Sequence, residues 1–300
     1  MKEIEIIKKL YNKKIYDKLD DCYLFDGKYL ITTDTISEGT HFKHEWSSAA
    51  DIACKLVEVN VSDIASSGGL PKIAFLNLGL SKVSKESIWL SPFIKQLKTC
   101  LKKYKITLEG GDTYSSEKTN LTLTLIGKTN SPILRANGNE NDFIYLTGCI
   151  GLSQLGFKIL KDNIILPWNL KKEALERHLR PKSRLSLSKI LTKQFQITAM
   201  MDITDGLVQD TKKLAQASDL KLEINIDKIP RIKEFQEYIS IDEILSSGEE
   251  LELLFLSKIK IKNIKNLPIT CIGRAVKGKH VNFWLNKKRY KPYREGFFHF

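Results

Sequence analysis

The sequence predicts a two-domain protein of the mixed α/β (α+β) class. Its 300 residues are more than a single domain usually holds. Segments with an apolar period of two alternate with segments of helical period in both halves, which is typical of sheets covered by helices. A polar stretch at residues 135–141 (RANGNEN) interrupts this series. We therefore predict an N-terminal domain over residues 1–138 and a C-terminal domain over residues 139–300.

The first half contains the clearest helix of the chain. Residues 49–66 place Ile52, Leu56, Val59 and Ile64 on one side, as expected of a helix that packs on a sheet. The other elements expected in this half are a short amphipathic helix within residues 1–14, strands at 28–34, 73–80 and 121–128, and a helix at 85–104.

In the second half, a strand at residues 198–203 leads directly into a helix at residues 207–217. Asp205 stands just before that helix, and aspartate is a preferred residue where a helix N-terminus is capped. We therefore expect Asp205 to cap the helix. The other elements expected in this half are strands at 142–147, 221–226, 251–257, 269–274 and 281–284, and helices at 152–160 and 183–193.

The net charge of +13 does not by itself indicate a nucleic-acid-binding protein. The lysines are spread along the chain, whereas nucleic-acid binding favours a clustered basic patch with interleaved aromatic side chains. We expect pairs such as Lys212-Lys213 to lie on solvated helix faces, with some attraction for anionic substrates. A steeply salt-dependent affinity for DNA would indicate the alternative.

The sequence also argues against membrane, secreted and zinc-binding classes. The longest apolar runs are far shorter than the roughly 20 residues of a membrane span, and the charged start is unlike a signal peptide. The five cysteines are scattered and form no CxxC pair, which argues against a disulfide framework or a zinc site. We expect a cytoplasmic protein whose cysteines are mostly buried, small apolar side chains.

Five short motifs place aspartate beside small, hydroxyl or glycine residues. Mg²⁺ prefers oxygen ligands and is usually shared with substrate phosphates, and small neighbours let a phosphate approach the backbone. Such motifs inside a basic protein therefore indicate phosphate chemistry with hard cations. The motifs are Asp20-Asp21, Thr32-Thr33-Asp34, Asn60-Val61-Ser62-Asp63, Gly110-Gly111-Asp112 and Asp202-Ile203-Thr204-Asp205-Gly206.

The motifs differ in how specifically they indicate a site. The last one is the most specific, because two carboxylates bracket Thr204 at a strand-to-helix junction, where the helix N-terminus favours phosphate oxygens. Asp34 is expected at a strand end, where a simple turn is the alternative. Gly110-Gly111-Asp112 is expected either as a turn whose N–H groups cradle a phosphate or as a plain hairpin turn. Asp63 shares a helix face with Asn60, three residues before it.

Two further signals are weak. Residues 273–279 (GRAVKGK) fit the start of a phosphate-binding P-loop, but His280 stands where a serine or threonine would bind Mg²⁺, and a strand follows. His41 and His44 lack further zinc ligands at a suitable spacing, so we expect His41 to contact a substrate instead. The sequence contains no G-x-S-x-G nucleophile motif and no catalytic-cysteine signature.

The ordered set of motifs resembles that of the thiamine-monophosphate kinase family, in the superfamily shared with aminoimidazole ribonucleotide synthetase. The resemblance extends nearly from end to end. The matching segments are DDC (20–22), TTDT and EGTHF (within 32–42), NVSDIASSGGLP (60–71), EGGDT (109–113), RHLRPKSR (177–184), DITDGL (202–207), SSGEE (246–250) and GFFHF (296–300).

The resemblance implies an enzyme that uses ATP and several Mg²⁺ ions to convert thiamine monophosphate into thiamine diphosphate. It implies an aminoimidazole ribonucleotide synthetase-like fold, in which an N-terminal ATP- and Mg-binding domain pairs its sheet with that of a second copy in a homodimer. The metal ligands implied are Asp21, Thr32, Thr33, Asp34, Asp63, Asp112, Asp202 and Asp205. The ATP contacts implied are Gly111, Asp112, Arg135 and Thr204, and the thiamine-phosphate contacts are His41, Glu249 and Phe297.

No general base accompanies these carboxylates. A hydroxyl acceptor would need one, whereas a phosphate monoester, with a second pKa of about 6, is already largely dianionic. We therefore expect direct in-line transfer of the γ-phosphoryl group without a covalent enzyme intermediate. The alternatives are another ATP-dependent synthetase of the same superfamily and a non-catalytic nucleotide-binding relative. Departures from the family pattern at Lys18-Leu19 and Tyr114-Ser115-Ser116 motivate the second alternative.

Overall fold

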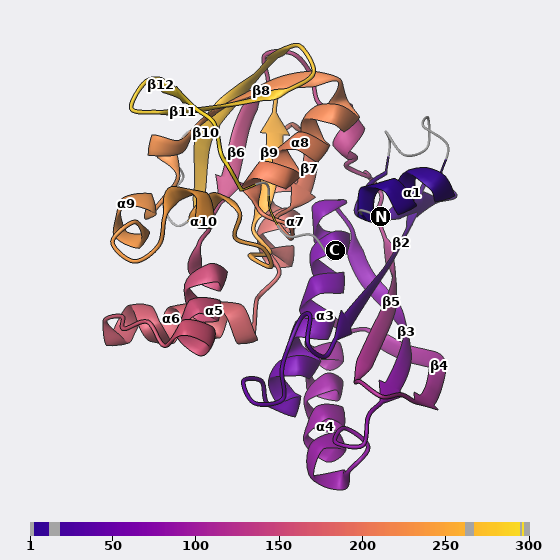
Figure 1. The fold of residues 1–300 in the computed structure, drawn as a ribbon. Coiled ribbons are helices and arrows are strands. Elements are labelled where there is room, and N and C mark those ends of the chain that lie inside the picture. Colours follow the sequence, from indigo (N-terminus) through magenta and orange to yellow (C-terminus); the bar gives the residue numbers. More distant parts are fainter. Residues whose placement is uncertain (1–2, 12–18, 262–266, 295, 297–300) are drawn as a thin grey trace. The chain divides into compact units, whose positions relative to one another are not determined.

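The computed structural model describes residues 3–11, 19–261, 267–294 and 296. The chain, drawn in Figure 1 with colours that follow the sequence, divides into two compact units. Unit 1 comprises Met1–Asp21, Ile133–His178 and Ser186–Phe300, and unit 2 comprises Cys22–Pro132 and Leu179–Leu185. The predicted class, two domains of mixed helices and sheets, is confirmed.

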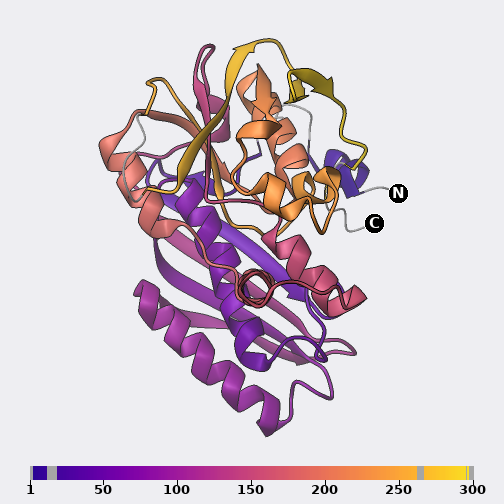
Figure 2. The same cartoon turned by 90° about the vertical axis from the view of Figure 1, so that its left-hand side faces the viewer.

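Unit 2 is built on a five-stranded sheet covered on one face by two helices. Its elements are β1 (Tyr23–Phe25), β2 (Tyr29–Ser37), α3 (Ala49–Ser66), β3 (Leu70–Leu80), α4 (Ser87–Tyr104), β4 (Thr107–Ser115) and β5 (Asn120–Lys128). The strand order is β1-β2-β5-β3-β4, in which only β3 and β4 are parallel. Helix α3 packs on β2, β5 and β3, and α4 lies alongside α3 (Figure 2).

The two faces of this sheet differ in burial. Along β5, Leu121, Leu123 and Leu125 are fully buried and join the core beneath α3 and α4. On the opposite face of β2, Thr33 and Thr35 are exposed. This alternation is the period of two that predicts strands, and it leaves one face of the sheet open.

Unit 1 is built on a seven-stranded sheet in the order β12-β11-β8-β10-β6-β9-β7. Its strands are β6 (Phe143–Thr147), β7 (Ile197–Asp202), β8 (Leu220–Asn225), β9 (Leu253–Ser257), β10 (Ile269–Lys277), β11 (Val281–Leu285) and β12 (Lys288–Tyr290). Its helices are α1 (Glu3–Leu10), η1 (Arg135–Asn137), α5 (Leu152–Asp162), α6 (Trp168–Leu179), α7 (Leu185–Gln194), α8 (Leu207–Ser218), η2 (Ile226–Lys228), α9 (Ile232–Phe235) and α10 (Ile241–Leu245).

Hydrophobic cores lie on both faces of the seven-stranded sheet. In β6, Ile144 and Leu146 belong to one buried cluster, together with residues of α5 and α8. Tyr145, between them, belongs to a second cluster with Leu187 and Leu191 of α7. Helices therefore cover both faces of the sheet, α5 and α8 on one and α7 on the other, as expected for an α/β domain.

Two motifs lie elsewhere in their elements than the sequence predicts. Asp34 was expected at a strand end but lies inside β2, because the pairing with β5 continues to Ser37. Gly110-Gly111-Asp112 was expected as a turn but lies within β4, where it pairs with β3. The sequence also did not predict β1, α6, α9, α10 or β12. Among the residues that the structure describes, no helix combines the length and apolarity that a membrane crossing needs.

Candidate functional site

The most specific motif lies at the junction between β7 and α8 in unit 1. Strand β7 ends at Asp202 and helix α8 begins at Leu207. Gly206 makes the turn with a φ of +105°, and a Cβ at this position would lie 2.7 Å from the backbone of Ser246. Only glycine tolerates this combination of conformation and close approach. The turn therefore brings Asp202 and Asp205 close to the N-terminus of α8.

Asp210, in the first turn of α8, holds this junction in place. Its Oδ2 atom accepts hydrogen bonds from the backbone N–H groups of Thr204, Asp205 and Gly206, each at 3.1 Å. The side chain is fully buried, and burial raises the pKa of its carboxyl to about 6, although the Lys213 ammonium opposes this effect. The N–H groups of the turn itself are thus already engaged, so they are not free to bind a phosphate.

The expectation that Asp205 caps α8 is wrong. Gly206 is the capping residue, and it provides no side chain to bond the helix. Asp205 instead accepts hydrogen bonds from Gln209 Nε2 at 3.2 Å and from the Lys213 ammonium. The physical reason is that the helix is capped one residue later, at Gly206, and that Gln209 and Lys213 already engage the Asp205 carboxylate.

Lys213 belongs to the site, although the sequence places it on a solvated helix face. It forms ion pairs with Asp205 and, at 3.1 Å, with Asp210 Oδ1. Burial opposes its charge, but the Asp210 and Asp205 carboxylates raise the pKa of Lys213 above its ordinary value. The spacing of three residues between Asp210 and Lys213 on one helix is the signal that could have identified this pair.

The Asp20-Asp21 motif, also in unit 1, binds Arg135. The Arg135 guanidinium pairs with Asp21, and the Arg135 backbone N–H donates to Asp20 Oδ2 at 2.8 Å. Burial and the neighbouring Asp21 raise the pKa of Asp20 to about 6, against the opposing effect of Arg135. Asp20 is therefore a positioning residue that the sequence analysis missed, because adjacent carboxylates in a loop are usually solvated.

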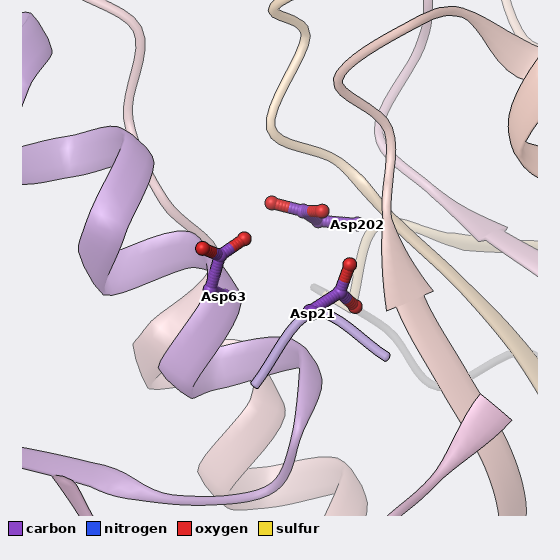
Figure 3. A group of neighbouring side chains, drawn as sticks. All are labelled: Asp21, Asp63 and Asp202. Carbon is purple, nitrogen blue, oxygen red and sulfur yellow. The ribbon is translucent and has the colours of Figure 1, made fainter. Parts of the chain in front are cut away.

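Two predicted metal ligands of unit 1 come together. Ligand oxygens of Asp21 and Asp202 lie within 4.8 Å of one another, and Asp202 is fully buried. Figure 3 shows the Asp202 side chain and, below it, the Asp21 carboxylate; the third side chain drawn, Asp63, belongs to unit 2. A donor set made only of carboxylate oxygens suits a hard divalent cation, and such a cation would offset the cost of burying Asp202.

The loop at residues 246–252 lies against the same turn of unit 1. The backbone N–H of Glu249 donates to the Thr204 carbonyl at 2.8 Å, and Glu249 has a φ of +53°, which is unusual for a residue with a side chain. The next acidic residue, Glu250, is fully buried and accepts hydrogen bonds from the backbone N–H groups of Gly151 and Ser153. Glu249 is thus held beside the Asp202–Gly206 turn by the backbone.

Arg177 anchors this loop from helix α6. Its Nη1 atom donates to the Glu250 carbonyl and to Glu252 Oε1, both at 2.8 Å. Burial raises the pKa of the Glu250 carboxyl, although Arg177 opposes this. Arg177 lies in the RHLRPKSR segment, which could have identified it as a site residue. No spacing in the sequence, however, connects Arg177 to residues 250–252.

In unit 2, the site residues lie on β2 and α3. Thr32 Oγ1 donates to Asp63 Oδ2, which joins the strand to the helix. Asp34 shares the face of β2 with Thr32, because side chains alternate along a strand. The Thr33 hydroxyl points to the opposite face, where it lies 3.0 Å from Thr124 Oγ1. The structure therefore associates Asp63 with Thr32 and does not bring the Thr33 side chain to them.

Helix α3 also buries two polar groups beside Asp63. Asn60 and Ser62 are fully buried, and Asn60 Nδ2 donates to the Leu56 carbonyl at 2.9 Å. The Asn60 Oδ1 and Ser62 Oγ atoms have no hydrogen-bond partner among the described residues. Unsatisfied buried polar atoms are costly, so this part of α3 is built for something other than packing alone.

The Gly110-Gly111-Asp112 motif lies in edge strand β4. Gly111 has a φ of +146°, and a Cβ there would lie 1.7 Å from the Leu76 carbonyl oxygen of the neighbouring strand. Asp112 is exposed, and its Oδ1 accepts the Thr113 backbone N–H at 2.8 Å. Glycine thus permits a close approach of two strands here, which is why the expected turn is absent.

The predicted substrate contacts are only partly described. His41 Nδ1 accepts the Ser37 backbone N–H at 3.0 Å, so in the neutral ring Nε2 carries the proton and can donate. Phe297 lies outside the residues that the structure describes.

Two family models match the chain. The model described as AIR synthase related protein, N-terminal domain, matches residues 19–129, and the model for the C-terminal domain of the same family matches residues 139–284. Together they cover most of the sequence.

Individual relatives match over the full length. The chain is 49% identical over 302 residues to thiamine-monophosphate kinase of Leptospira interrogans, covering 100% of this chain and 98% of that protein. Among solved structures, one described as AaThiL complexed with AMPPCP and TMP gives a TM-score of 0.85 at 32% identity, covering 99% of this chain and 96% of the other. The crystal structure of thiamine monophosphate kinase from Aquifex aeolicus gives a TM-score of 0.83 at 32% identity, covering 97% of both chains.

Proposed function

This chain belongs to the thiamine-monophosphate kinase family of AIR synthase related proteins, and we propose that it transfers the γ-phosphoryl group of ATP to thiamine monophosphate. The product is thiamine diphosphate. The observation that carries the proposal is the turn at Asp202–Gly206, where two carboxylates, a helix N-terminus and the Lys213 ammonium meet beside Glu249. The full-length similarity to kinases of this name supports the same reaction.

The donor set supports Mg²⁺ as the resident cation. In unit 1 the proposed ligands are Asp21, Asp202 and Asp205, and the first two already lie close together. When bound, Mg²⁺ would neutralise charge on the phosphate oxygens as it accumulates during transfer. In unit 2 the proposed ligands are Thr32, Asp34, Asp63 and Asp112, together with a backbone oxygen of Thr33, whose side chain lies on the opposite face of β2.

Several side chains would bind the nucleotide directly. Arg135 uses part of its guanidinium for Asp21, and the remaining N–H donors suit the phosphates of ATP. Gly111, Asp112 and Thr204 are the other proposed ATP contacts. Lys213 offsets part of the negative charge of Asp205 and Asp210, which weakens the repulsion of phosphates there.

The acceptor would be held by a different set of residues. We assign thiamine monophosphate to His41, Glu249 and Phe297. The Nε2–H group of His41 is a hydrogen-bond donor, which suits a phosphate oxygen. Glu249 offers a carboxylate, suited to a cationic or amino-bearing ring. Phe297 offers a ring on which a thiamine ring can stack.

The transfer needs no general base, because the acceptor phosphate is already largely ionised at neutral pH. We propose direct in-line transfer without a phosphorylated enzyme. We propose that residues 1–138 form the ATP- and Mg-binding and dimerisation domain and that residues 139–300 form a C-terminal α/β domain. We assign the protein to the cytoplasm, where both substrates would be made.

The test is to incubate the full chain with Mg-ATP and thiamine monophosphate and to detect thiamine diphosphate. Unphosphorylated thiamine is the matched control acceptor, because it lacks the phosphate that the mechanism requires. The proposal is supported if thiamine diphosphate forms from thiamine monophosphate and not from thiamine. It is contradicted if thiamine, and not the monophosphate, is phosphorylated. In a single turnover with γ-labelled ATP, label on the protein would contradict direct transfer.

We also propose a homodimer formed through the open face of the unit 2 sheet. Phe75 and Tyr114 lie on β3 and β4 with 40% and 49% of their surfaces exposed, which is high for aromatic side chains on a sheet. Phe75→Glu should convert the dimer to a monomer in light scattering. Ile88→Glu on α4, where Ile88 is 88% exposed, is the control that should remain dimeric. A wild-type monomer would contradict the assignment.

A further inference from the structure

Cys54 and Cys100 lie side by side in unit 2, on the packed helices α3 and α4. Their sulfur atoms are 3.5 Å apart, and both thiols are free. Cys100 is buried and Cys54 is partly exposed, so a small solute can reach the pair through Cys54. We propose that Cys54 and Cys100 are a redox-active dithiol that a hydroperoxide converts into an intramolecular disulfide.

The surroundings of the pair favour a thiolate. Gln96 Nε2 donates to the sulfurs of Cys54 and Cys100, at 3.2 and 3.5 Å. Arg180, which pairs with Asp51, acts to lower the pKa of Cys54, whereas at Cys100 the Glu58 carboxylate opposes the effect of its ion-pair partner Lys103. The amide donor of Gln96 and the partial exposure of Cys54 are therefore the features that favour a reactive pair.

The two cysteines have different roles. The hydrogen bond between the two thiols lowers the pKa of Cys100 to about 7 despite burial, and it raises the pKa of Cys54. Cys100 is therefore the nucleophile that reacts with peroxide, and Cys54 is the thiol that resolves the product.

The chemistry balances without any group from the kinase reaction. The Cys100 thiolate attacks the O–O bond of the hydroperoxide, giving a sulfenic acid on Cys100 and an alkoxide or hydroxide that takes up a proton. The sulfur loses two electrons and the peroxide gains them. The Cys54 thiol then attacks the Cys100 sulfur, the S–S bond forms, and hydroxide leaves with the Cys54 proton as water.

The geometry needs little change. A disulfide has an S–S distance of about 2.05 Å, so the sulfurs must approach by about 1.5 Å from their present 3.5 Å. Both helices belong to one hydrophobic core, which holds the cysteines in place before the reaction. Because the bond would join residues 46 positions apart, it should raise the temperature of unfolding.

The test uses the full chain, reduced, freed of reductant and treated with a small excess of hydrogen peroxide. Intact mass spectrometry should show a loss of about 2 Da for two hydrogens. Tryptic digestion without reductant should yield peptide 44–55 linked to peptide 99–102, and reductant should separate them. A linkage between other cysteines, or oxidation by 16 Da steps alone, would overturn the proposal.

Serine variants separate the two roles. Dimedone traps sulfenic acids. In the Cys54→Ser variant it should label Cys100, and this labelling should be at least tenfold stronger than the labelling of Cys54 in the Cys100→Ser variant. Equal labelling would overturn the assignment of the nucleophile. Cys149→Ser is the matched control, because burial raises the pKa of Cys149 to about 12 and its loss should leave the disulfide unchanged. Thermal unfolding of each variant confirms that it is folded.

Discussion

Replacing Gly111 by alanine should displace strand β4 from strand β3. The new Cβ would lie 1.7 Å from the Leu76 carbonyl oxygen, which is 1.3 Å short of the 3.0 Å that real Cβ contacts respect. The obstacle is backbone rather than a flexible side chain, so no rotamer change relieves it. The φ of +146° adds strain for any residue with a Cβ.

The size of the effect follows from two contributions. Backbone strain of this kind costs about 1–3 kcal/mol, and each ladder hydrogen bond lost as β4 moves costs about 1 kcal/mol. We expect Gly111→Ala to lower the free energy of unfolding by about 3–5 kcal/mol. At about 2–4 °C per kcal/mol, the unfolding temperature of the affected unit should fall by at least about 6 °C.

The neighbouring glycine supplies the control. A Cβ at Gly110 would lie 3.3 Å from the Phe75 ring, a side chain that can move, and Gly110 has no positive φ. Gly110→Ala should therefore change the free energy of unfolding by about 1 kcal/mol or less. Urea denaturation followed by fluorescence and circular dichroism compares the two variants. If they differ by less than about 1 kcal/mol, the close approach of Gly111 to Leu76 is not what requires glycine.

Three further predictions concern charged residues. Asp205→Asn should lower kcat for thiamine diphosphate formation by about 100-fold or more, with an unchanged circular dichroism spectrum. Near-normal turnover in excess Mg²⁺ would exclude Asp205 as a metal ligand. Lys213→Met should destabilise the protein by about 1–2 kcal/mol because it leaves a buried carboxylate without its cation, whereas Lys212→Met should change stability by no more than about 0.5 kcal/mol. Against the effect of burial, the Lys158 ammonium and hydrogen bonds from Ser240 lower the pKa of Glu243 to about 2 from its ordinary 4.5. The ionised Glu243 therefore stabilises the fold above pH 4.5, and this stabilisation is lost as the pH falls through 2. Glu243→Gln should remove that part of the acid dependence in urea titrations at pH 2–5 and cost about 2 kcal/mol at pH 7.

Local signals account for what the sequence predicted well. Helix α3 has the predicted bounds because its apolar period is regular and because Ser48 and Asp51 form a reciprocal cap at its start. The Asp202–Gly206 junction was likewise predicted from a strand pattern, a glycine and a helix pattern that follow one another directly. Such features depend on residues within one turn of each other, so a single sequence contains them.

Contacts between distant residues account for what it missed. The sequence does not show that the Leu76 carbonyl lies against Gly111, so a turn was the natural expectation for two glycines before an aspartate. Likewise, no pattern of neighbouring residues shows that Arg135 pairs with Asp21, which is 114 positions away in the chain. The sequence does predict that Thr32 and Thr33 lie on opposite faces of a strand, but it does not show that Thr32 is the one that meets Asp63 of α3.

The residues missed share a role that residue type alone does not reveal. Asp20 and Asp210 bind no predicted ligand; they hold Arg135 and the Asp202–Gly206 turn. A variant of either would therefore lower activity by moving a neighbour, and its kinetics alone would resemble the loss of a ligand. Stability separates the two cases. Removing the Asp210 carboxylate releases three backbone N–H groups and should destabilise the fold. Removing a carboxylate that only binds a cation relieves repulsion between neighbouring acids, so the metal-free protein should be as stable as before or more stable.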